Sequence, residues 1–332
     1  MKKIILIIFL SGLLVFFNCC DPDGPDHHVK IIILDDFDPD YTNPPFDDRV
    51  SILDYTGTLI SHIYFSDFNI SATIGGQRGL SASRDGNYFA VGQYITNPGL
   101  SKYDMSGNLI FQARGSVLAC CFYQSRIYAL TTDGTIFGDE SFAVDGSGNI
   151  IASSSLSGFD LVVDDLHHWV WFVGVNVIRL DLDLNPLMTA DPIVYLAISV
   201  DTDSLGNAWV CERNHPQIHE SLNRVFKIAA DGEILVTITD ITAPSCVRVN
   251  KNTQYIWVAH GNGISSYDPD GNLYQTVPGV PSRMLEIDPN DQSVWVATYQ
   301  DVRHYSRNGN LLDIFTTHFS PSSQKYVALA VQ

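Results

Sequence analysis

The chain has 332 residues, of which 45% are hydrophobic and 17% are charged, and its formal net charge is −18 at pH 7. An apolar fraction of this size is typical of a globular domain and excludes a wholly disordered chain. The excess of acidic residues repels phosphate backbones, so we expect no nucleic-acid partner.

The first 18 residues have the pattern of a secretory signal. Lys2 and Lys3 supply positive charge, and residues 4–17 form an apolar stretch that is short for a membrane-spanning helix. The stretch leads into Asn18-Cys19-Cys20, which resembles the site where bacterial lipoproteins receive lipid on a cysteine and are cleaved. Cys19 is the predicted lipidated residue, because the residue before the acceptor should be small. An uncleaved N-terminal anchor or an ordinary secreted protein is the alternative.

Residues 19–28 follow as a lipidated cysteine and a polar segment rich in Asp, Pro and Gly. Such a composition cannot bury a core and is typical of a short tether. The sequence therefore predicts attachment to a membrane of the bacterial cell envelope through an N-terminal lipid. We expect one folded domain, residues 29–332, that faces the periplasm or the cell surface.

A phrase of the form Tyr-Asp-x-x-Gly-Asn-Leu recurs along this domain. Asp and Asn tolerate left-handed backbone and cap their own turns, and Gly supplies a positive φ, so each copy predicts a tight reversal between two short strands. Most copies are preceded by an aromatic residue and small apolar residues, as in Trp209-Val210-Cys211 and Trp257-Val258-Ala259. Seven copies, 36 to 50 residues apart, are centred on Gly57, Gly107, Gly148, Leu184, Gly232, Gly271 and Gly309.

Each repeat holds four short strands, a to d, in about 40 residues, which is the length of one β-propeller blade. The repeats predict an all-β, seven-bladed β-propeller of four-stranded antiparallel blades, with six or eight blades as alternatives. Only three strands can be assigned at the N-terminus, residues 29–34, 49–53 and 58–65, and one strand, residues 325–331, remains at the C-terminus. We expect that last strand to complete the first blade and close the ring, which removes exposed edges.

The repeats resemble those of NHL-like propellers, and in particular the streptogramin-lyase-like group, whose blades carry similar Gly-Asn-x-Trp-Val and Tyr-Asp-x-x-Gly-x-Leu phrases. The resemblance covers residues 29–332 and implies a propeller fold. For the lyase group it also implies a magnesium-assisted elimination with a histidine and a glutamate near the mouth of the central channel. His260 and Glu212 match these positions, as base and as metal or substrate ligand respectively.

Candidate ligand-binding residues follow the b strands, because the b–c loops of a propeller surround the mouth of its channel. Asp35, Glu212 and His260 occupy this position in blades one, five and six. The b–c loop of blade five is the most elaborate and adds Arg213, His215, His219 and Glu220. A metal site on its two histidines is the alternative to a solvated loop, because Pro216 disfavours a regular helix through both.

The b–c loop of blade one is strongly acidic. Asp36, Asp38 and Asp40 have the alternating spacing with which a loop can wrap oxygen ligands around calcium. However, Tyr41 stands where an EF-hand-type loop needs glycine, so a polar loop of turn-forming residues is the preferred interpretation. A Ca²⁺ or Mg²⁺ ion is the alternative, and no other cofactor is expected.

Four cysteines lie inside the domain, in apolar stretches that predict buried free thiols: Cys120, Cys121, Cys211 and Cys246. Adjacent cysteines on a strand point to opposite faces, so Cys120 and Cys121 are poorly placed to bridge each other. A Cys211–Cys246 disulfide is the alternative. No Cys-x-x-Cys pair for a metal is present.

The preferred functional hypothesis is a monomeric, envelope-anchored lipoprotein whose propeller binds a protein, peptide or glycan. It is motivated by a full set of structural repeats without a Gly-x-Ser-x-Gly elbow, a Walker loop, a dinucleotide fingerprint or an HExxH motif. The alternative is a divalent-metal-dependent lyase or hydrolase that uses Asp35, Glu212 and His260. A purely structural role inside an envelope complex is the third hypothesis.

Overall fold

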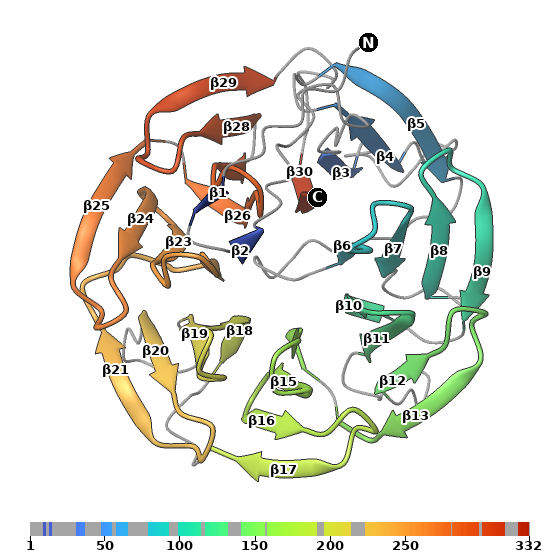
Figure 1. Ribbon diagram of the computed structural model, residues 1–332, viewed down its shortest axis with the longest axis horizontal. Helices are drawn as coiled ribbons and strands as arrows, with labels where there is room; N and C mark the ends of the chain where they lie inside the picture. Colours follow the sequence, from blue (N-terminus) through green and yellow to red (C-terminus); the bar gives the residue numbers. More distant parts are fainter. Residues whose placement is uncertain are drawn as a thin grey trace, which may run out of the picture.

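The structure is a computed structural model of the chain. It describes residues 9–10, 13–14, 31–36, 48–54, 58–65, 79–92, 99–113, 117–131, 141–156, 158–190, 196–213, 223–279, 281–298, 301–315 and 325–331. In these residues the strands form small antiparallel sheets arranged in a circle around a central axis (Figure 1). The prediction of an all-β propeller built of four-stranded antiparallel blades is confirmed.

Within the described residues there are seven four-stranded sheets, and the strands of each follow one another from the innermost to the outermost. The first three are β30 (Lys325–Val331), β3 (Ile31–Asp36), β4 (Asp48–Leu53) and β5 (Leu59–Phe65); β6 (Leu80–Ala82), β7 (Tyr88–Gly92), β8 (Leu100–Asp104) and β9 (Leu109–Ala113); and β10 (Val117–Tyr123), β11 (Arg126–Thr131), β12 (Ser141–Val144) and β13 (Ile150–Ser154). The fourth and fifth are β14 (Asp160–Asp164), β15 (Trp169–Val173), β16 (Val177–Leu180) and β17 (Pro186–Thr189); and β18 (Ala197–Thr202), β19 (Ala208–Glu212), β20 (Arg224–Ile228) and β21 (Ile234–Ile238). The last two are β22 (Cys246–Val249), β23 (Ile256–His260), β24 (Gly263–Tyr267) and β25 (Leu273–Pro278); and β26 (Ser282–Ile287), β27 (Val294–Thr298), β28 (Val302–Tyr305) and β29 (Leu311–Phe315).

The two ends of the chain meet in the first blade. Strand β30 pairs antiparallel with β3, from Ile31 opposite Val331 to Asp36 opposite Lys325. The innermost strands contact one another around the whole circuit, and β30 lies between β26 and β6 (Figure 1). The C-terminal strand therefore closes the ring, as the sequence predicts.

A further pair of two-residue strands, β1 (Phe9–Leu10) and β2 (Leu13–Leu14), falls inside the expected signal segment. Across the described ranges, no helix has the length and apolar character needed to span a membrane. Cys19 and the tether lie outside the described residues, so lipidation stays a prediction.

The core lies between the flat faces of neighbouring blades. The b-strand tryptophans Trp171, Trp209 and Trp295 are almost wholly buried, because large rings cover much of the surface that one blade presents to the next. Apolar clusters run across blade boundaries; one of them joins Val50 of β4 to Phe89 of β7 and Trp295 of β27. A single thin sheet could not exclude water, so the stability of each blade depends on its neighbours.

The recurring phrase forms the turn between strands c and d. In the second blade, Asp104 Oδ1 accepts the backbone N–H groups of Ser106 and Asn108, both at 2.9 Å, and Asp104 Oδ2 accepts from the Asn108 amide at 2.8 Å. Gly107 supplies the left-handed residue, with φ of 86°. The Asn108 amide and these N–H groups lower the pKa of Asp104. The same Asp–Asn bonding recurs at Asp145, Asp181 and Asp268.

Cations on strand c join neighbouring blades. Lys102 lies over the Tyr88 ring at 4.3 Å and donates to Gly146 O, in the c–d turn of the next blade, at 3.4 Å. Lys227 repeats the arrangement over Trp209, and it donates to Pro269 O of the following blade at 3.3 Å. Each such cation therefore ties one blade to the turn of the next.

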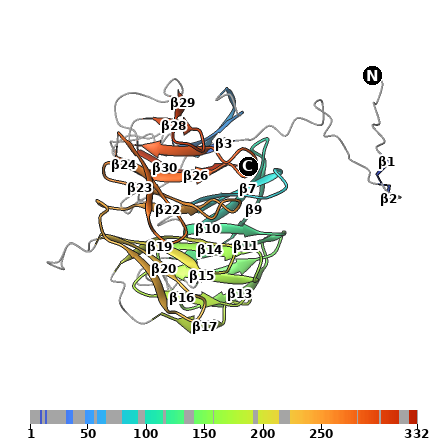
Figure 2. The same ribbon diagram turned by 60° about the vertical axis from the view of Figure 1, so that its left-hand side comes forward.

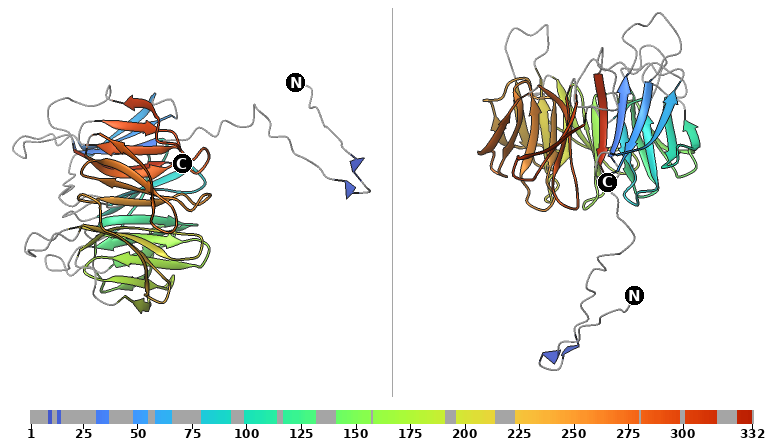
Figure 3. Two further views of the ribbon diagram at one scale, coloured as in Figure 1. Left: turned by 90° about the vertical axis from the view of Figure 1, so that its left-hand side faces the viewer. Right: turned by 90° about the horizontal axis from the view of Figure 1, so that it is seen from above.

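The ring has two faces, and strands cross from one to the other (Figures 2 and 3). We call the face with the a–b and c–d connections the turn face, and the face with the b–c and d–a connections the loop face. Two to six residues separate consecutive strands on the turn face, whereas two to fourteen separate them on the loop face. The turn face is uniform and the loop face varies from blade to blade.

Candidate functional site

The candidate residues Asp35, Glu212 and His260 lie at the loop-face ends of the b strands β3, β19 and β23. Asp35 is placed by its backbone, opposite Arg49 of β4. Arg213 directly follows β19, and its N–H donates to Leu196 O at 3.1 Å. His215, His219 and Glu220 lie outside the described residues, as does the acidic loop of the first blade from residue 37 to residue 47.

Glu212 belongs to an ion pair inside its own blade. Its side chain is fully buried, and Arg224, directly opposite on β20, donates from Nε to Oε2 at 2.7 Å. The Arg224 guanidinium also lies over the Phe226 ring at 4.7 Å. A buried carboxylate with a cation on it is compensated in charge, so the ion pair with Arg224 explains the buried Glu212 without a metal ion.

His260 has both ring nitrogens engaged within its blade. The Asn262 backbone N–H donates to Nδ1 at 3.2 Å, which makes Nδ1 the acceptor and leaves the proton on Nε2. Nε2 then donates to Ser265 Oγ at 2.9 Å, and that hydroxyl also bonds Thr276 Oγ1 at 3.0 Å. Burial lowers the pKa of His260, because the imidazolium form would lose its hydration. The side chain is therefore a neutral histidine that holds the tight b–c turn.

We expect His260 to make stability fall in mild acid. Its folded pKa lies below the unfolded value of about 6.5, so above that pH neither state is protonated and His260 contributes no pH dependence. As the pH falls below about 6.5, the unfolded chain takes up a proton first and stability is lost. Urea denaturation at pH 7.5 and 5.5 should show a larger loss for the wild type than for His260→Gln, by at most about 1.4 kcal/mol per group. Equal losses in the two proteins would contradict this assignment.

The b–c turn of the last blade is held in the same way by polar side chains, although the sequence predicts no site residue there. Thr298, which ends β27, donates from Oγ1 to Asp301 Oδ1 at 2.7 Å. Arg303 holds Asp301 with two bonds, from Nε at 2.9 Å and from Nη2 at 3.0 Å. The described polar side chains at the ends of the b strands in blades five, six and seven are thus each held by partners on their own blade.

A second polar network lies on the innermost strands, and sequence reasoning did not find it. Arg248 of β22 is 2% exposed; it donates from Nε to Glu286 Oε1 of β26 at 2.6 Å and from Nη1 to Ser199 Oγ of β18 at 3.3 Å. Arg248 is therefore a buried cation shared by three consecutive blades. The only sequence signal was the presence of charged residues inside two otherwise apolar strands: one in CVRV and two in SRMLEI.

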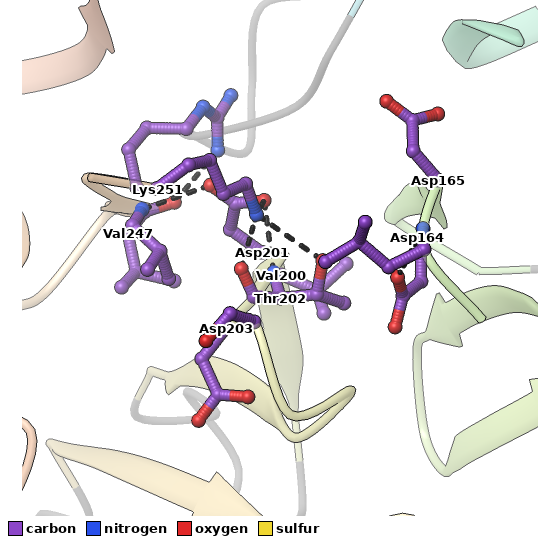
Figure 4. A network of polar contacts seen from close by, with 12 residues as sticks. Asp164, Asp165, Val200, Asp201, Thr202, Asp203, Val247 and Lys251 are labelled. Atoms are coloured by element: carbon purple, nitrogen blue, oxygen red, sulfur yellow. Dashed lines mark hydrogen bonds and ion pairs between the residues drawn. The ribbon is translucent and has the colours of Figure 1, made fainter. Parts of the chain in front are cut away.

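Neighbouring side chains of this network cap the inner edge of the next blade. Asp160 Oδ2 accepts the N–H of Val200 at 3.0 Å, and Asp201 Oδ2 accepts the N–H of Val249 at 2.8 Å. Lys251 bonds Asp201 Oδ1 at 3.2 Å and also reaches the carbonyl of Thr202 (Figure 4). These contacts satisfy N–H groups that an innermost strand would otherwise present unpaired to the channel.

His167 on the turn face has a structural role. Asp164 caps the a–b turn of blade four, and its Oδ2 bonds His167 Nδ1 at 2.8 Å. His167 in turn stacks on Trp169, with 4.9 Å between the ring centroids. Asp203 caps the corresponding turn of blade five in the same way, so the position is a repeated feature of the blades.

Neither a metal cluster nor a disulfide occurs in the described part of the chain. No three His, Cys, Asp or Glu side chains there are placed to share a metal ion. Cys120, Cys121, Cys211 and Cys246 are free and buried, as the sequence predicts, and the Cys211–Cys246 disulfide does not form. Burial raises the pKa of the Cys211 and Cys246 thiols, which keeps them protonated.

Comparison with known proteins identifies the fold. No protein-family model and no curated protein matches the chain. Among solved structures, a functionally unknown protein from Desulfotomaculum acetoxidans DSM 771 is similar with a TM-score of 0.65 at 9% identity, covering 91% of this chain and 99% of that chain. A protein of unknown function from Bacteroides caccae gives 0.50 at 9% identity, covering 92% and 98%. The C-terminal WD40 domain of Sif2 gives 0.55 at 14% identity, covering 85% and 79%.

At these identities the likeness concerns the β-propeller fold alone. The NHL-like and streptogramin-lyase-like subtype stays a prediction.

Proposed function

We propose that this chain is a lipoprotein of the bacterial cell envelope whose propeller binds a protein, peptide or glycan on its loop face. The observation that carries the proposal is the asymmetry between the two faces. Every described connection on the turn face is short, whereas the loop face combines tight turns with long loops. Binding surfaces are typically built from variable loops on a rigid scaffold.

The long loops gather on particular blades. Eleven residues, 213–223, separate β19 from β20 in blade five, whereas only residues 261–262 separate β23 from β24 in blade six. Eleven residues, 37–47, follow β3, and fourteen, 66–79, lead from the first blade to the second. Two residues are enough to connect strands b and c, so the nine additional residues in blade five are not needed to join the strands. The added length therefore favours a role in recognition.

The hydrogen bonds made by Glu212 and His260, at the ends of their b strands, favour a binding protein over a metal-dependent enzyme. A metal ligand or a general base needs a lone pair directed at the reacting group. Both His260 nitrogens are engaged by Asn262 and Ser265, which leaves His260 no lone pair for this purpose, and the charge of Glu212 is compensated by Arg224. These side chains stabilise the scaffold, which leaves recognition to the loops between them.

The composition of two loops, residues 37–47 and 132–140, favours a polar or cationic ligand. Residues 37–47 contain three aspartates and no basic residue, and residues 132–140 contain two aspartates and one glutamate. An acidic surface attracts basic peptide segments and can hydrogen-bond the hydroxyl groups of a glycan, whereas it repels nucleic acid. Neutral glycans and basic peptides are therefore the two classes of ligand to screen.

We expect recognition to depend on the loop at residues 213–223. Its replacement by Gly-Asn, which is the complete b–c connection of blade six, should weaken binding at least tenfold in a screen against a glycan array and an immobilised library of basic peptides. The matched control is the exposed turn-face substitution Ser147→Ala, which should leave every interaction unchanged. Retained binding after loop replacement, with loss in the control, would place recognition on the turn face and overturn the proposal.

Membrane anchoring is tested separately. Palmitate labelling and flotation with membranes are expected for the full chain and should both be lost in Cys19→Ser, because one lipid-bearing cysteine with more than one acyl chain suffices for stable attachment. Cys20→Ser is the matched control and should keep both. Loss in Cys20→Ser with retention in Cys19→Ser would move the lipid to Cys20.

A further inference from the structure

We infer that the propeller is held with its turn face toward the membrane and its loop face away from it. This inference rests on the proposed lipid anchor and adds a direction to it. The first strand after the tether is β3, which begins at Ile31 and ends at Asp36, where the b–c loop of the first blade starts. Strand β3 therefore runs from the turn face to the loop face, and the tether joins the domain at the turn face.

The point of attachment lies near the axis of the ring. Strand β3 is the second strand of its blade and is covered on the outside by β4 and β5 (Figure 1). Adjacent strands are about 4.8 Å apart. A chain that starts at β3 must therefore cross both outer strands before it reaches the rim of the propeller.

The tether is too short to let the domain turn over freely. Twelve residues, 19–30, precede Ile31, and they span at most about 40 Å when fully extended. The blade strands have three to seven residues, and the longest of them, at about 3.3 Å per residue, make the ring about 20 Å thick. To place the loop face on the membrane, the tether would have to run outward over β4 and β5 and then along the whole thickness, which uses most of its reach and costs conformational entropy.

Electrostatics do not favour adhesion of the turn face itself. Its c–d turns carry an acidic residue in most blades, including Asp104, Asp145, Asp181 and Asp268. Anionic headgroups repel such a face, so attachment geometry sets the orientation and contact with lipid does not. The consequence is that the long loops point away from the membrane, where a large ligand can reach them.

Fluorescence energy transfer in proteoliposomes tests the orientation. Single cysteines are introduced on the turn face by Ser147→Cys or Asp270→Cys, and on the loop face by Val175→Cys or Thr239→Cys; all four positions are exposed. Each variant also carries Cys20→Ser. The four domain cysteines are buried, so the protein without an added cysteine should take no dye.

With a donor dye on the protein and acceptor dye on lipid headgroups, we expect efficient transfer from both turn-face sites. Transfer should drop at both loop-face sites, which are about 20 Å further away. The turn-face sites lie in blades three and six, on well-separated sides of the ring, so their average reduces the effect of tilt on the reference to which the loop-face sites in blades four and five are compared. Equal transfer from the two faces, or stronger transfer from the loop face, would overturn the orientation.

The same samples separate this inference from the anchor on which it rests. A protein that floats with the vesicles but gives equal or reversed transfer is anchored without the inferred orientation, so only the inference fails. A protein that neither carries lipid nor floats lacks the proposed anchor, and the orientation is then overturned with it. Transfer that disappears in Cys19→Ser while the ordered pattern holds for the parent supports both.

Discussion

Replacing Arg248 with Met is expected to lower the free energy of unfolding by about 3–5 kcal/mol, the range for removing one partner of a buried ion pair. Arg248 is 2% exposed and donates to Glu286, Ser199 and the carbonyl of Val247. Its removal leaves Glu286 without its cation and takes away the donor shared by three blades. Equilibrium urea denaturation at neutral pH measures the loss.

Two variants give the control for Arg248. Arg307→Met removes an exposed arginine and should change the unfolding free energy by less than about 0.5 kcal/mol. Glu286→Gln combined with Arg248→Met should recover part of the loss, because it removes an acid that the single variant leaves uncompensated. A cost below about 1 kcal/mol for Arg248→Met, or a fully additive double variant, would contradict a role for this pair in holding the blades together.

Gly271→Ala is expected to cost about 2–4 kcal/mol, because two penalties act at one position. Gly271 has a φ of 84°, a region that L-residues rarely adopt, and a Cβ there would lie 2.4 Å from Val236 Cγ1 of β21 in the preceding blade. The turn glycine thus provides both the backbone reversal and the room for the neighbouring blade. Urea denaturation of the single variant measures the combined cost.

A double-mutant cycle separates the two penalties. Val236→Ala removes the atom that the new Cβ would meet, so Gly271→Ala should cost less in that background, by about 1 kcal/mol or more. Gly146→Ala is the matched control, because Gly146 lies in the corresponding turn of blade three without a positive φ and its nearest contact would be 3.7 Å away. Equal costs for Gly146→Ala and Gly271→Ala would show that the glycine requirement does not come from packing between blades.

The blade architecture could be predicted because turn chemistry is local. In the complete copies of the phrase, such as the one at residues 104–108, the Asp, Gly and Asn bond within five residues, so the phrase itself sets where strand c ends and strand d begins. The expected third strand of the first blade, residues 58–65, corresponds to β5 at Leu59–Phe65, and the closing strand at residues 325–331 has the bounds of β30. The N-terminus supplies three strands and the C-terminus supplies one, so a four-stranded blade predicts that the two ends pair.

The state of the site residues could not be predicted in the same way. Glu212 meets Arg224 across an eleven-residue loop, and this pairing depends on a register that the sequence does not display. Arg248 and Glu286 lie in neighbouring blades, so the spacing of residues within one repeat does not predict their contact. The position of His260 at the end of a b strand indicates a candidate site residue, and only its hydrogen bonds to Asn262 and Ser265 identify it as a residue that holds a turn.

Nitrogen NMR of the His260 imidazole during titration with divalent ions measures whether this side chain belongs to the scaffold or to a metal centre. If the polar ends of the b strands belong to the scaffold, His260 keeps a proton on Nε2 and an unprotonated Nδ1 at pH 7, and neither signal moves with Mg²⁺, Ca²⁺ or Mn²⁺. Saturable shifts of either nitrogen, accompanied by stoichiometric metal in elemental analysis, would show a metal centre at the channel mouth and contradict the scaffold role.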